Sequence, residues 1–335
     1  MTPASFQTTF SDVHPLIIQT QILPRLDGQS LSSVATASSY LRSLSSDDVL
    51  WSDICKSIWP SITHPRVNHV ISTFPAGHRS FFQDSFMPLI NDVKQPNIHR
   101  SWSNSQPDRS WPSELMSAVD IRYHDDIIYS KVEFTDTTTD FLSSALRIVL
   151  KDDLDVAGIP KSIDLKVEEP VHDDDATILH LKESITLNWI LIDPTRKQAV
   201  NLSSIKPVLA WINNDICLRY AVVIPGTESN EMVEFRIEVK FAVGKGGVAL
   251  HVREVTLHVQ DLACNCLSGK DFLVIISRAF LEKYKTRRTL VVDEGGCHQK
   301  EWVKKEETVM CRVDYAYIML ILSSLLCFCF FDMLS

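Results

Sequence analysis

The sequence of residues 14–55 is HPLIIQTQILPRLDGQSLSSVATASSYLRSLSSDDVLWSDIC. Its apolar residues recur at intervals of three and four, which is the spacing of amphipathic helices. Pro15 suits the first position of a helix, and Pro24 should end or kink that helix at Leu23, because proline lacks an N–H and clashes with the preceding turn. The stretch therefore predicts three short helices. Ser30 is the candidate N-cap of the second, whose periodic positions run from Leu31 through Ser38 to Leu44.

The third predicted helix has a continuous apolar face. Its apolar positions are Leu50, Trp51, Ile54, Cys55, Ile58 and Trp59. Ser45, Ser46 and Asp47 are candidate N-caps, and Pro60 should stop the helix. On this face Cys55 is expected to behave as a small buried hydrophobe, because a reactive thiol needs a cation or a helix N-terminus beside it. Three short helices cannot bury this much apolar surface among themselves, since a core of fewer than about 70 residues supplies only a few kcal/mol, so a partner is expected.

The clearest β signal lies in residues 232–243, MVEFRIEVKFAV, where apolar and charged residues alternate strictly. A period of two with one apolar face predicts a half-buried antiparallel strand. The glycine-rich GKGG at 244–247 can supply a turn, and VALHVREVTLHVQ at 248–260 predicts the return strand. The apolar alternation of that strand changes phase at Arg253 and Glu254, which predicts a β-bulge there.

Several further segments have the composition of strands, and no helical pattern of 10–15 residues separates them. They are residues 119–123, 145–150, 162–167, 184–193, 208–212 and 216–224. Trp189 is in phase with the apolar residues of its segment, so it is expected in the core. The sequence therefore predicts an α+β fold, with three N-terminal helices followed by a mainly antiparallel β-sandwich-like domain.

Changes in composition divide the chain into five predicted regions. They are a helical module at 12–59, a connector of short helices and loops at 60–117, a β-rich domain at 118–285, a polar linker at 286–314 and an apolar tail at 315–331. The β-rich domain, with its loops, is the candidate for binding a target.

The apolar tail, YAYIMLILSSLLCFCFF, contains no charged residue. As a helix it would span roughly 26 Å, slightly less than the ~30 Å hydrocarbon core of a bilayer. Lys304, Lys305 and Arg312 precede it, which fits a cytosolic body with a C-terminal membrane anchor. A terminal segment packed against the fold is the alternative, and the sequence leaves both open.

Composition and charge exclude several classes of protein. The net charge of −9 and the absence of a basic stripe argue against binding nucleic acid. The eight cysteines are too sparse and irregular for a disulfide framework and suit a reducing compartment. The N-terminus has no basic segment followed by an apolar one, so no signal peptide is expected.

Three clusters resemble functional sites only in part. They are GKGG at 244–247, Cys264 and Cys266 with Cys297 and His298, and the acidic run at 172–175. The first lacks the rest of a phosphate-binding motif, the second lacks zinc-finger spacing, and the third is expected to be a solvated loop. Motifs of serine hydrolases, metalloproteases and dinucleotide-binding proteins are also missing. The sequence therefore predicts no catalytic residue, no metal site and no cofactor.

The N-terminal stretch resembles the F-box family, whose members dock substrate receptors onto the Skp adaptor of SCF-type ubiquitin ligases. The matching elements are Pro15, the signature Ile22-Leu23-x-x-Leu26, Leu31 at the start of the second helix, and Leu50-Trp51-x-x-Ile54-Cys55 at the end. The chain departs from the family pattern at Pro24 and at Ala37-Ser38-x-x-Leu41. WSDICKSIWPS, ISTFPAGHRSFFQDSF and NWILIDPTRKQAVNLSS are similar to a plant subgroup of the family with β-rich C-terminal regions.

The resemblance implies which residues pack the three-helix unit and fill the groove of the adaptor. They are Pro15, Leu16, Ile18, Ile22, Leu23, Leu26, Leu31, Val34, Leu50 and Trp51. It also implies a non-catalytic substrate-recognition subunit in the nucleus or cytoplasm, or on the cytosolic face of a membrane if the tail is an anchor. Its partners would be a Skp-type adaptor, a cullin bound through that adaptor, and a protein target.

A second resemblance is weaker. Residues 235–247 and 268–280 are similar to the β-sandwich of phloem-lectin-type proteins. The alternative function is therefore a lectin-like or other binding module whose F-box is degenerate and which does not act in a ligase.

Overall fold

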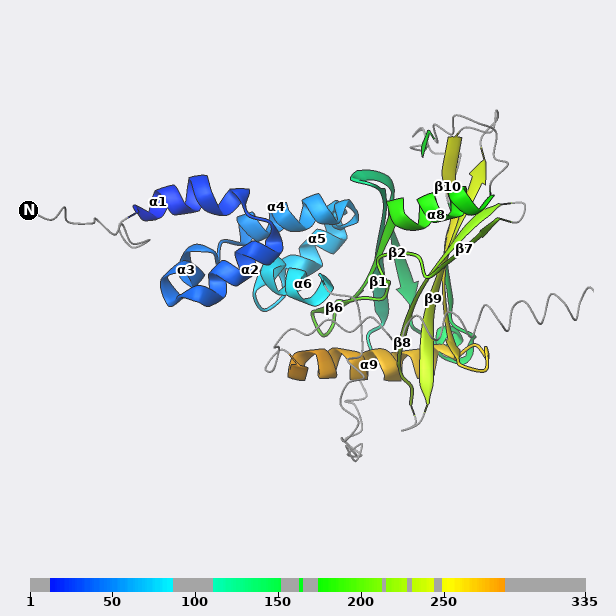
Figure 1. Ribbon diagram of the computed structural model, residues 1–335. Helices are drawn as coiled ribbons and strands as arrows, with labels where there is room; N and C mark the ends of the chain where they lie inside the picture. Colours follow the sequence, from blue (N-terminus) through cyan, green and yellow to red (C-terminus); the bar gives the residue numbers. More distant parts are fainter. Residues whose placement is uncertain are drawn as a thin grey trace, which may run out of the picture. The chain divides into compact units, whose positions relative to one another are not determined.

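The computed structural model describes residues 13–86, 111–151, 163–164, 174–212, 215–227, 231–243 and 249–286 (Figure 1). Short helices come first and two antiparallel sheets follow, which confirms the predicted α+β fold. The predicted tail at 315–331 lies outside these residues. Within the described part of the chain, no helix is long and apolar enough to cross a membrane.

The N-terminal region consists of short helices. They are α1 (Pro15–Ile17), η2 (Ile18–Ile22), η3 (Leu23–Arg25), α2 (Gly28–Ala37), α3 (Ser39–Leu44), α4 (Asp48–Ile58), η4 (Pro60–Thr63), α5 (Pro65–Ser72) and α6 (Gly77–Ser85). The π-helical turn η2 changes to the 3₁₀ turn η3 at Leu23, where Pro24 was predicted to end the first helix. Proline has no N–H to continue the hydrogen-bond ladder, which explains the change.

Two details of the predicted second helix are wrong. Its N-cap is Asp27, whose carboxylate accepts a hydrogen bond from the backbone N–H of Ser30 at 2.7 Å, so Ser30 is the donor. The helix also breaks at Ser38, which is extended and caps α3 by accepting from the backbone N–H of Leu41 at 3.1 Å. Serine and aspartate can cap or interrupt helices in this way because their side chains form hydrogen bonds with nearby backbone groups.

The third predicted helix is α4, with Asp47 at its N-cap and its last residue at Ile58. The helices that follow it pack on the same core. The ring centroids of Trp51 and Phe82 lie 5.3 Å apart, and those of Trp59 and Phe81 lie 5.6 Å apart. We therefore name residues 13–86 the helical module, which extends beyond the three helices predicted at 12–59.

The β domain contains two antiparallel sheets. Their strands are β1 (Glu114–Tyr123), β2 (Asp126–Asp136), β3 (Arg147–Lys151), β4 (Ile163–Asp164), β5 (Ile185–Asp193), β6 (Gln198–Asn201), β7 (Leu209–Ile212), β8 (Ile216–Pro225), β9 (Met232–Val243) and β10 (Ala249–Asp261). The smaller sheet has the order β2-β1-β5-β6, and the larger has the order β3-β10-β9-β8-β7 with β4 beside β10. Strands β2 and β6 were not predicted. The pairing of β9 with β10 shifts between Val252 and Glu254, which confirms the predicted bulge.

The two sheets pack face to face around an apolar core. Leu187, Trp189 and Leu191 of β5 point into it and are fully buried, as predicted for Trp189. The indole N–H of Trp189 donates to the hydroxyl of Ser117 at 3.1 Å, so its polar atom is satisfied inside the core. Alternate residues of β9, among them Phe235, meet the β5 side chains from the larger sheet.

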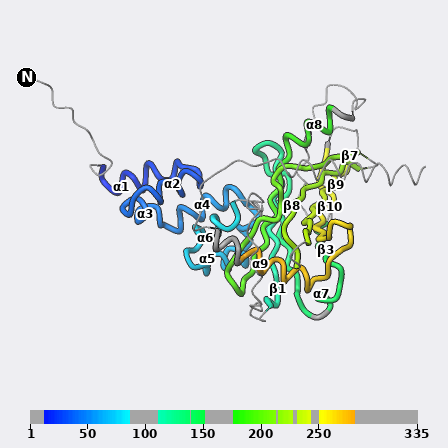
Figure 2. Tube along the Cα trace, turned by 60° about the horizontal axis from the view of Figure 1, so that its bottom comes forward, coloured from blue at the N-terminus to red at the C-terminus, as the bar shows by residue number. Residues whose placement is uncertain are grey.

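Three helices of the β domain were not predicted. They are α7 (Thr139–Ser143), α8 (Asp174–Ser184) and α9 (Gly269–Thr286). In Figures 1 and 2 the strands separate α8 from α9. The acidic run at 172–175 is therefore not simply a loop, because α8 begins at Asp174. Phe272, Ile276 and Phe280 of α9 pack on the sandwich core with a helical spacing that went unrecognised within an otherwise β-rich segment.

The smaller sheet is buried on both faces. Its second face packs against the helical module through Met116, Ala118, Ile190, Ile192 and Ala199. Helices, the smaller sheet and the larger sheet therefore form three layers (Figure 1).

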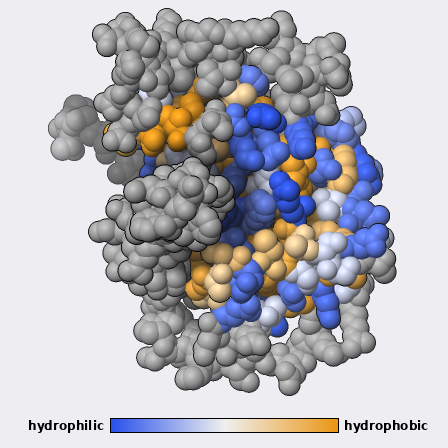
Figure 3. All heavy atoms as spheres, turned by 90° about the vertical axis from the view of Figure 1, so that its right-hand side faces the viewer, coloured by the Kyte–Doolittle hydropathy of each residue, from blue (hydrophilic) through white to orange (hydrophobic). Residues whose placement is uncertain are grey.

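The outward face of the larger sheet is lined by charged side chains in ion pairs. Arg219 pairs with Glu238 at 3.2 Å, and Lys240 pairs with Glu254 at 3.1 Å. Figure 3 shows hydrophilic residues over much of the coloured surface on this side of the molecule. This face is thus polar, in contrast to both faces of the smaller sheet.

Candidate functional site

The residues predicted to contact an adaptor fall into two groups. Ile18, Leu23, Leu31 and Trp51 are all at most 1% exposed and belong to the core of the helical module. Side chains this deeply buried cannot touch a partner unless the module opens. Their contribution is to the shape of the module.

Trp51 shows how closely this core is specified. Its indole N–H donates to the backbone carbonyl of Ser45 at 2.7 Å. The ring packs against Phe82, and the guanidinium of Arg79 lies 6.0 Å from the ring centroid. Trp51 therefore joins α4 to α6 within the chain.

The second group of predicted contact residues is accessible. Pro15 is exposed, Leu16 is 59% exposed, and Ile22, Leu26, Val34 and Leu50 are partly buried. Three exposed apolar residues of the module were missed: Ile17 at 50%, Tyr40 at 39% and Val49 at 66%. Ile17 lies beside the predicted Leu16 in the irregular turns around α1, where a helical projection does not give the orientation of a side chain, and Val49 lies beside the predicted Leu50 in the first turn of α4.

A polar network supports the N-terminus of α4. The Asp48 carboxylate accepts from the backbone N–H of His78 at 2.7 Å, and its second oxygen lies 3.0 Å from Nδ1 of the same residue. Nε2 of His78 lies 3.1 Å from the amide oxygen of Asn68. Gly77 has a φ of +54°, and a Cβ there would lie 2.2 Å from the Asp48 carboxylate, so only glycine fits. The network connects α4, α5 and α6.

Cys55 is fully buried, as its helical phase predicted. Burial raises the pKa of its thiol, and the negative charge of Asp48 raises it further. A thiol with a raised pKa holds its proton at neutral pH and is a poor nucleophile. Cys55 therefore packs the core and is not a reactive site.

A buried carboxylate joins the helical module to the smaller sheet. Asp120 of β1 accepts from the backbone N–H of Ser61 at 3.0 Å, from the Ser61 hydroxyl at 2.5 Å and from the Ser130 hydroxyl at 2.7 Å. Burial raises the pKa of Asp120, although these hydrogen bonds act in the opposite direction. The guanidinium of Arg122 adds bonds to the backbone carbonyls of Ser57 at 2.6 Å and Ile58 at 3.1 Å, at the end of α4.

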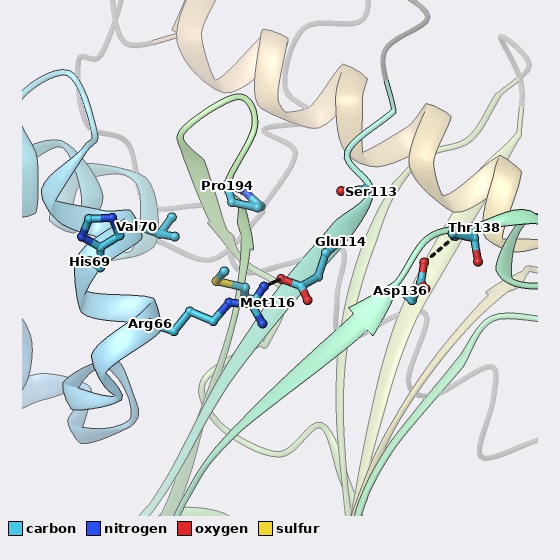
Figure 4. Close-up of a pocket in the computed structure, with 9 residues that line it drawn as sticks. All are labelled: Arg66, His69, Val70, Ser113, Glu114, Met116, Asp136, Thr138 and Pro194. Atoms are coloured by element: carbon cyan, nitrogen blue, oxygen red, sulfur yellow. Dashed lines mark hydrogen bonds and ion pairs between the residues drawn. The ribbon is translucent and has the colours of Figure 1, made fainter.

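We call the boundary between the helical module and the smaller sheet the seam. An open pocket of about 520 Å³ lies on it, between α5 and the strands β1 and β2 (Figure 4). We call it the seam pocket; the residues that its argument uses are Arg66, Val70, Glu114, Met116, Asp136 and Pro194. Arg66 donates to the Glu114 carboxylate at 2.7 Å, and its guanidinium lies 4.6 Å from the ring centroid of Phe134. Asp136 accepts from the backbone N–H of Thr138 at 2.9 Å. The pocket thus combines an apolar part with charged groups.

The described residues contain no group of three or more histidine, cysteine, aspartate or glutamate side chains that could hold a metal ion. Cys264 and Cys266 are exposed free thiols, whereas Cys297 and His298 lie outside the described residues. Of the four residues that only partly resembled a zinc site, the structure therefore describes just the cysteine pair.

Comparison with known proteins points to one group. No family model and no solved structure matches the chain. The F-box protein At2g27310 of Arabidopsis thaliana is 39% identical over 283 residues, covering 80% of the chain and 78% of the relative. The F-box protein At3g44326 of the same plant is 34% identical over 336 residues, covering 94% and 89%. The probable F-box protein At2g36090, also from this plant, is 36% identical over 300 residues, covering 88% and 82%.

Proposed function

Because the chain belongs to the F-box proteins of plants, we propose that it is the substrate-recognition subunit of an SCF-type ubiquitin ligase. In this proposal the helical module binds a Skp-type adaptor and, through it, a cullin, and the β domain binds a protein target. The chain itself supplies no chemistry. It raises the effective concentration of the target at the site of ubiquitin transfer, so that a tethered target reacts intramolecularly.

One observation carries the adaptor part of the proposal. On α1, the Leu16 side chain is 59% exposed and the Ile17 side chain is 50% exposed. They lie at one end of a module whose other large apolar side chains are mostly buried. Exposed apolar side chains grouped in this way are typical of interaction sites. The hydrogen bonds between Ser61 and Asp120 support the proposal that the β domain binds the target. They fix the orientation of the β domain relative to the helical module, which would bind the adaptor.

The test is a pull-down of the Skp adaptor by the full chain and by the double variant Leu16→Glu, Ile17→Glu. We expect adaptor affinity to fall by about a hundredfold, because two apolar contacts become charged. Leu179→Glu is the matched control, since Leu179 is 58% exposed but lies on α8 in the β domain. Variants at Leu23 or Trp51 are unsuitable, because removing these buried side chains would unfold the module.

Two results would contradict the proposal. If the double variant keeps its fold by circular dichroism and binds the adaptor as well as the wild type, the contact is not at α1. If the intact chain binds no Skp-type adaptor at all, the ligase assignment itself fails.

The lectin-like alternative has one observation in its favour. The second helix breaks at Ser38, within the segment where the chain departs from the F-box pattern. A glycan array probed with the full chain separates the two functions. A receptor for protein targets should give no signal, whereas a lectin should bind a defined set of sugars.

The apolar tail at 315–331 stays a prediction with two alternatives, a membrane anchor or a terminal segment packed against the fold, and it lies outside the described residues. Carbonate extraction of the full chain, compared with a chain ending before residue 315, tests this directly. An anchored protein remains in the pellet only when the tail is present.

A further inference from the structure

The apolar part of the seam pocket suits the hydrocarbon portion of a long side chain. Val70 of α5, Met116 of β1 and Pro194 after β5 line it, and none of them offers a side-chain hydrogen bond to a ligand. In Figure 4 these three residues lie around the opening that also faces Glu114. Long cationic side chains place their methylene groups against such surfaces and keep the charged end near polar groups.

The charged side chains of the seam pocket have a net negative charge. Glu114 and Asp136 are register partners on β1 and β2, so two carboxylates stand directly opposite each other. Like charges in this arrangement destabilise a sheet. Arg66 neutralises Glu114, but within the described residues no cation pairs with Asp136. The pocket therefore has one excess negative charge beside its apolar surface.

We infer that the seam pocket binds an arginine side chain from an extended segment of the target protein. The inference rests on the proposed function, since it states what the receptor recognises. The methylene groups of that arginine would lie on the partly buried Val70 and Pro194, over Met116, which is 2% exposed at the base of the pocket, and its guanidinium would bind Asp136. Arginine fits better than lysine because its planar guanidinium can donate two N–H groups to one carboxylate. A hydrated divalent cation fits poorly, because the apolar side chains of the pocket cannot replace its water ligands.

The experiment uses the full chain with ¹³C-labelled methionine methyl groups, with the Met116 signal assigned from a Met116→Leu variant. The probe is Nα-acetyl-arginine amide, and Nα-acetyl-citrulline amide is its neutral counterpart of nearly equal shape. We expect the arginine probe to shift the Met116 signal in a saturable way. The citrulline probe should bind at least about tenfold more weakly, because its interaction with the carboxylate is not charge-assisted.

The variant Asp136→Asn tests the charged end of the pocket. It should weaken the arginine probe about tenfold, while the fold is kept because the like-charge pair with Glu114 is removed. Asp126→Asn is the matched control: Asp126 is exposed at the opposite end of β2 and does not line the pocket. Its affinity for the probe should equal that of the wild type.

Three outcomes overturn the inference. Equal binding of the arginine and citrulline probes would show that the pocket does not distinguish a charged side chain from a neutral one. Unchanged binding by Asp136→Asn would place the cation elsewhere. Tighter binding of spermidine than of the arginine probe would identify a polyamine site in place of a site for a protein side chain.

The proposed function can fail separately. Asp136→Asn should bind the Skp adaptor as well as the wild type, because Asp136 lies at the end of β2 in the β domain and not in the helical module. If the wild-type chain binds the arginine probe but no adaptor, the ligase assignment is wrong and the pocket stands. If it binds the adaptor but not the probe, only the pocket assignment is wrong.

Discussion

The two faces of the smaller sheet are buried by different means. Toward the larger sheet, β5 presents large apolar side chains such as Leu187 and Trp189. Toward the helical module, the same sheet presents methionine, isoleucine and alanine side chains, and it places the carboxylate of Asp120 among them. Apolar contact is non-directional and tolerates many orientations, whereas the three hydrogen bonds to Asp120 require one. We infer that the first face supplies stability and the second fixes how the module sits on the sheet.

The largest effect is expected on the apolar face. Trp189→Ala should lower the free energy of unfolding by about 3–5 kcal/mol, because it removes a fully buried aromatic side chain and leaves a cavity. Denaturant unfolding measures it. Trp189→Phe, which keeps an aromatic ring but loses the bond to Ser117 and part of the buried ring volume, should cost clearly less. A loss below about 1 kcal/mol for the alanine variant would mean that this face is not the main source of stability.

The second prediction concerns the polar face. Asp120→Ala should lower the free energy of unfolding by about 2 kcal/mol, because the Ser61 N–H and the two serine hydroxyls lose their acceptor inside the protein. Asp120→Asn keeps an acceptor and should lose less. The expected signature is faster proteolysis of the helical module than of the β domain. Equal cleavage of both regions would argue that Asp120 does not hold them together.

The pH dependence sharpens the same point. The pKa of Asp120 is raised above 3.8 in the folded protein, so the folded state holds this proton more tightly than the unfolded chain does. Stability contributed by this group is therefore present at low pH and lost as pH rises through the window from 3.8 up to the raised pKa. The stability of the wild type relative to Asp120→Asn should fall across that window and then become constant. A difference that rises with pH would show that the hydrogen bonds dominate over burial.

The smallest effect is expected at the exposed edge of the seam. Arg66 is 55% exposed and pairs with Glu114, so a double-mutant cycle with Arg66→Met and Glu114→Gln should give a coupling energy of about 0.5 kcal/mol. The coupling should weaken with added salt. A value that is large and insensitive to salt would mean that the edge, and not Asp120, orients the module.

Local patterns predicted much of this architecture. Pro24 predicted where the first helix ends, and the alternation at 232–243 predicted a strand and the bulge opposite it. Trp189 was placed in the core from its phase with its neighbours. These features depend on residues a few positions apart, so one segment contains the information. The helix α9 shows where prediction from local patterns failed. Its apolar residues have helical spacing, but they lie in a region that was interpreted as strands.

The candidate site could be predicted only in part. The resemblance of the N-terminal stretch to the F-box family implied its family and its apolar residues. Which of those residues are exposed depends on α6, because Phe82 covers Trp51 from a helix that was not part of the predicted module. The seam pocket gave no signal in the sequence, since Arg66 meets Glu114 across 48 positions.

By itself, the sequence determined the α+β class, the three N-terminal helices, the half-buried strands and the burial of Cys55, because each follows from periodicity within one segment. The tertiary structure alone decided that Leu16 and Ile17 face outward while Trp51 faces inward. It also decided that Asp120 receives its hydrogen bonds from Ser61, 59 positions away. Burial and pairing of this kind depend on which distant segments pack against each other, and the pattern of residues within one segment does not determine this.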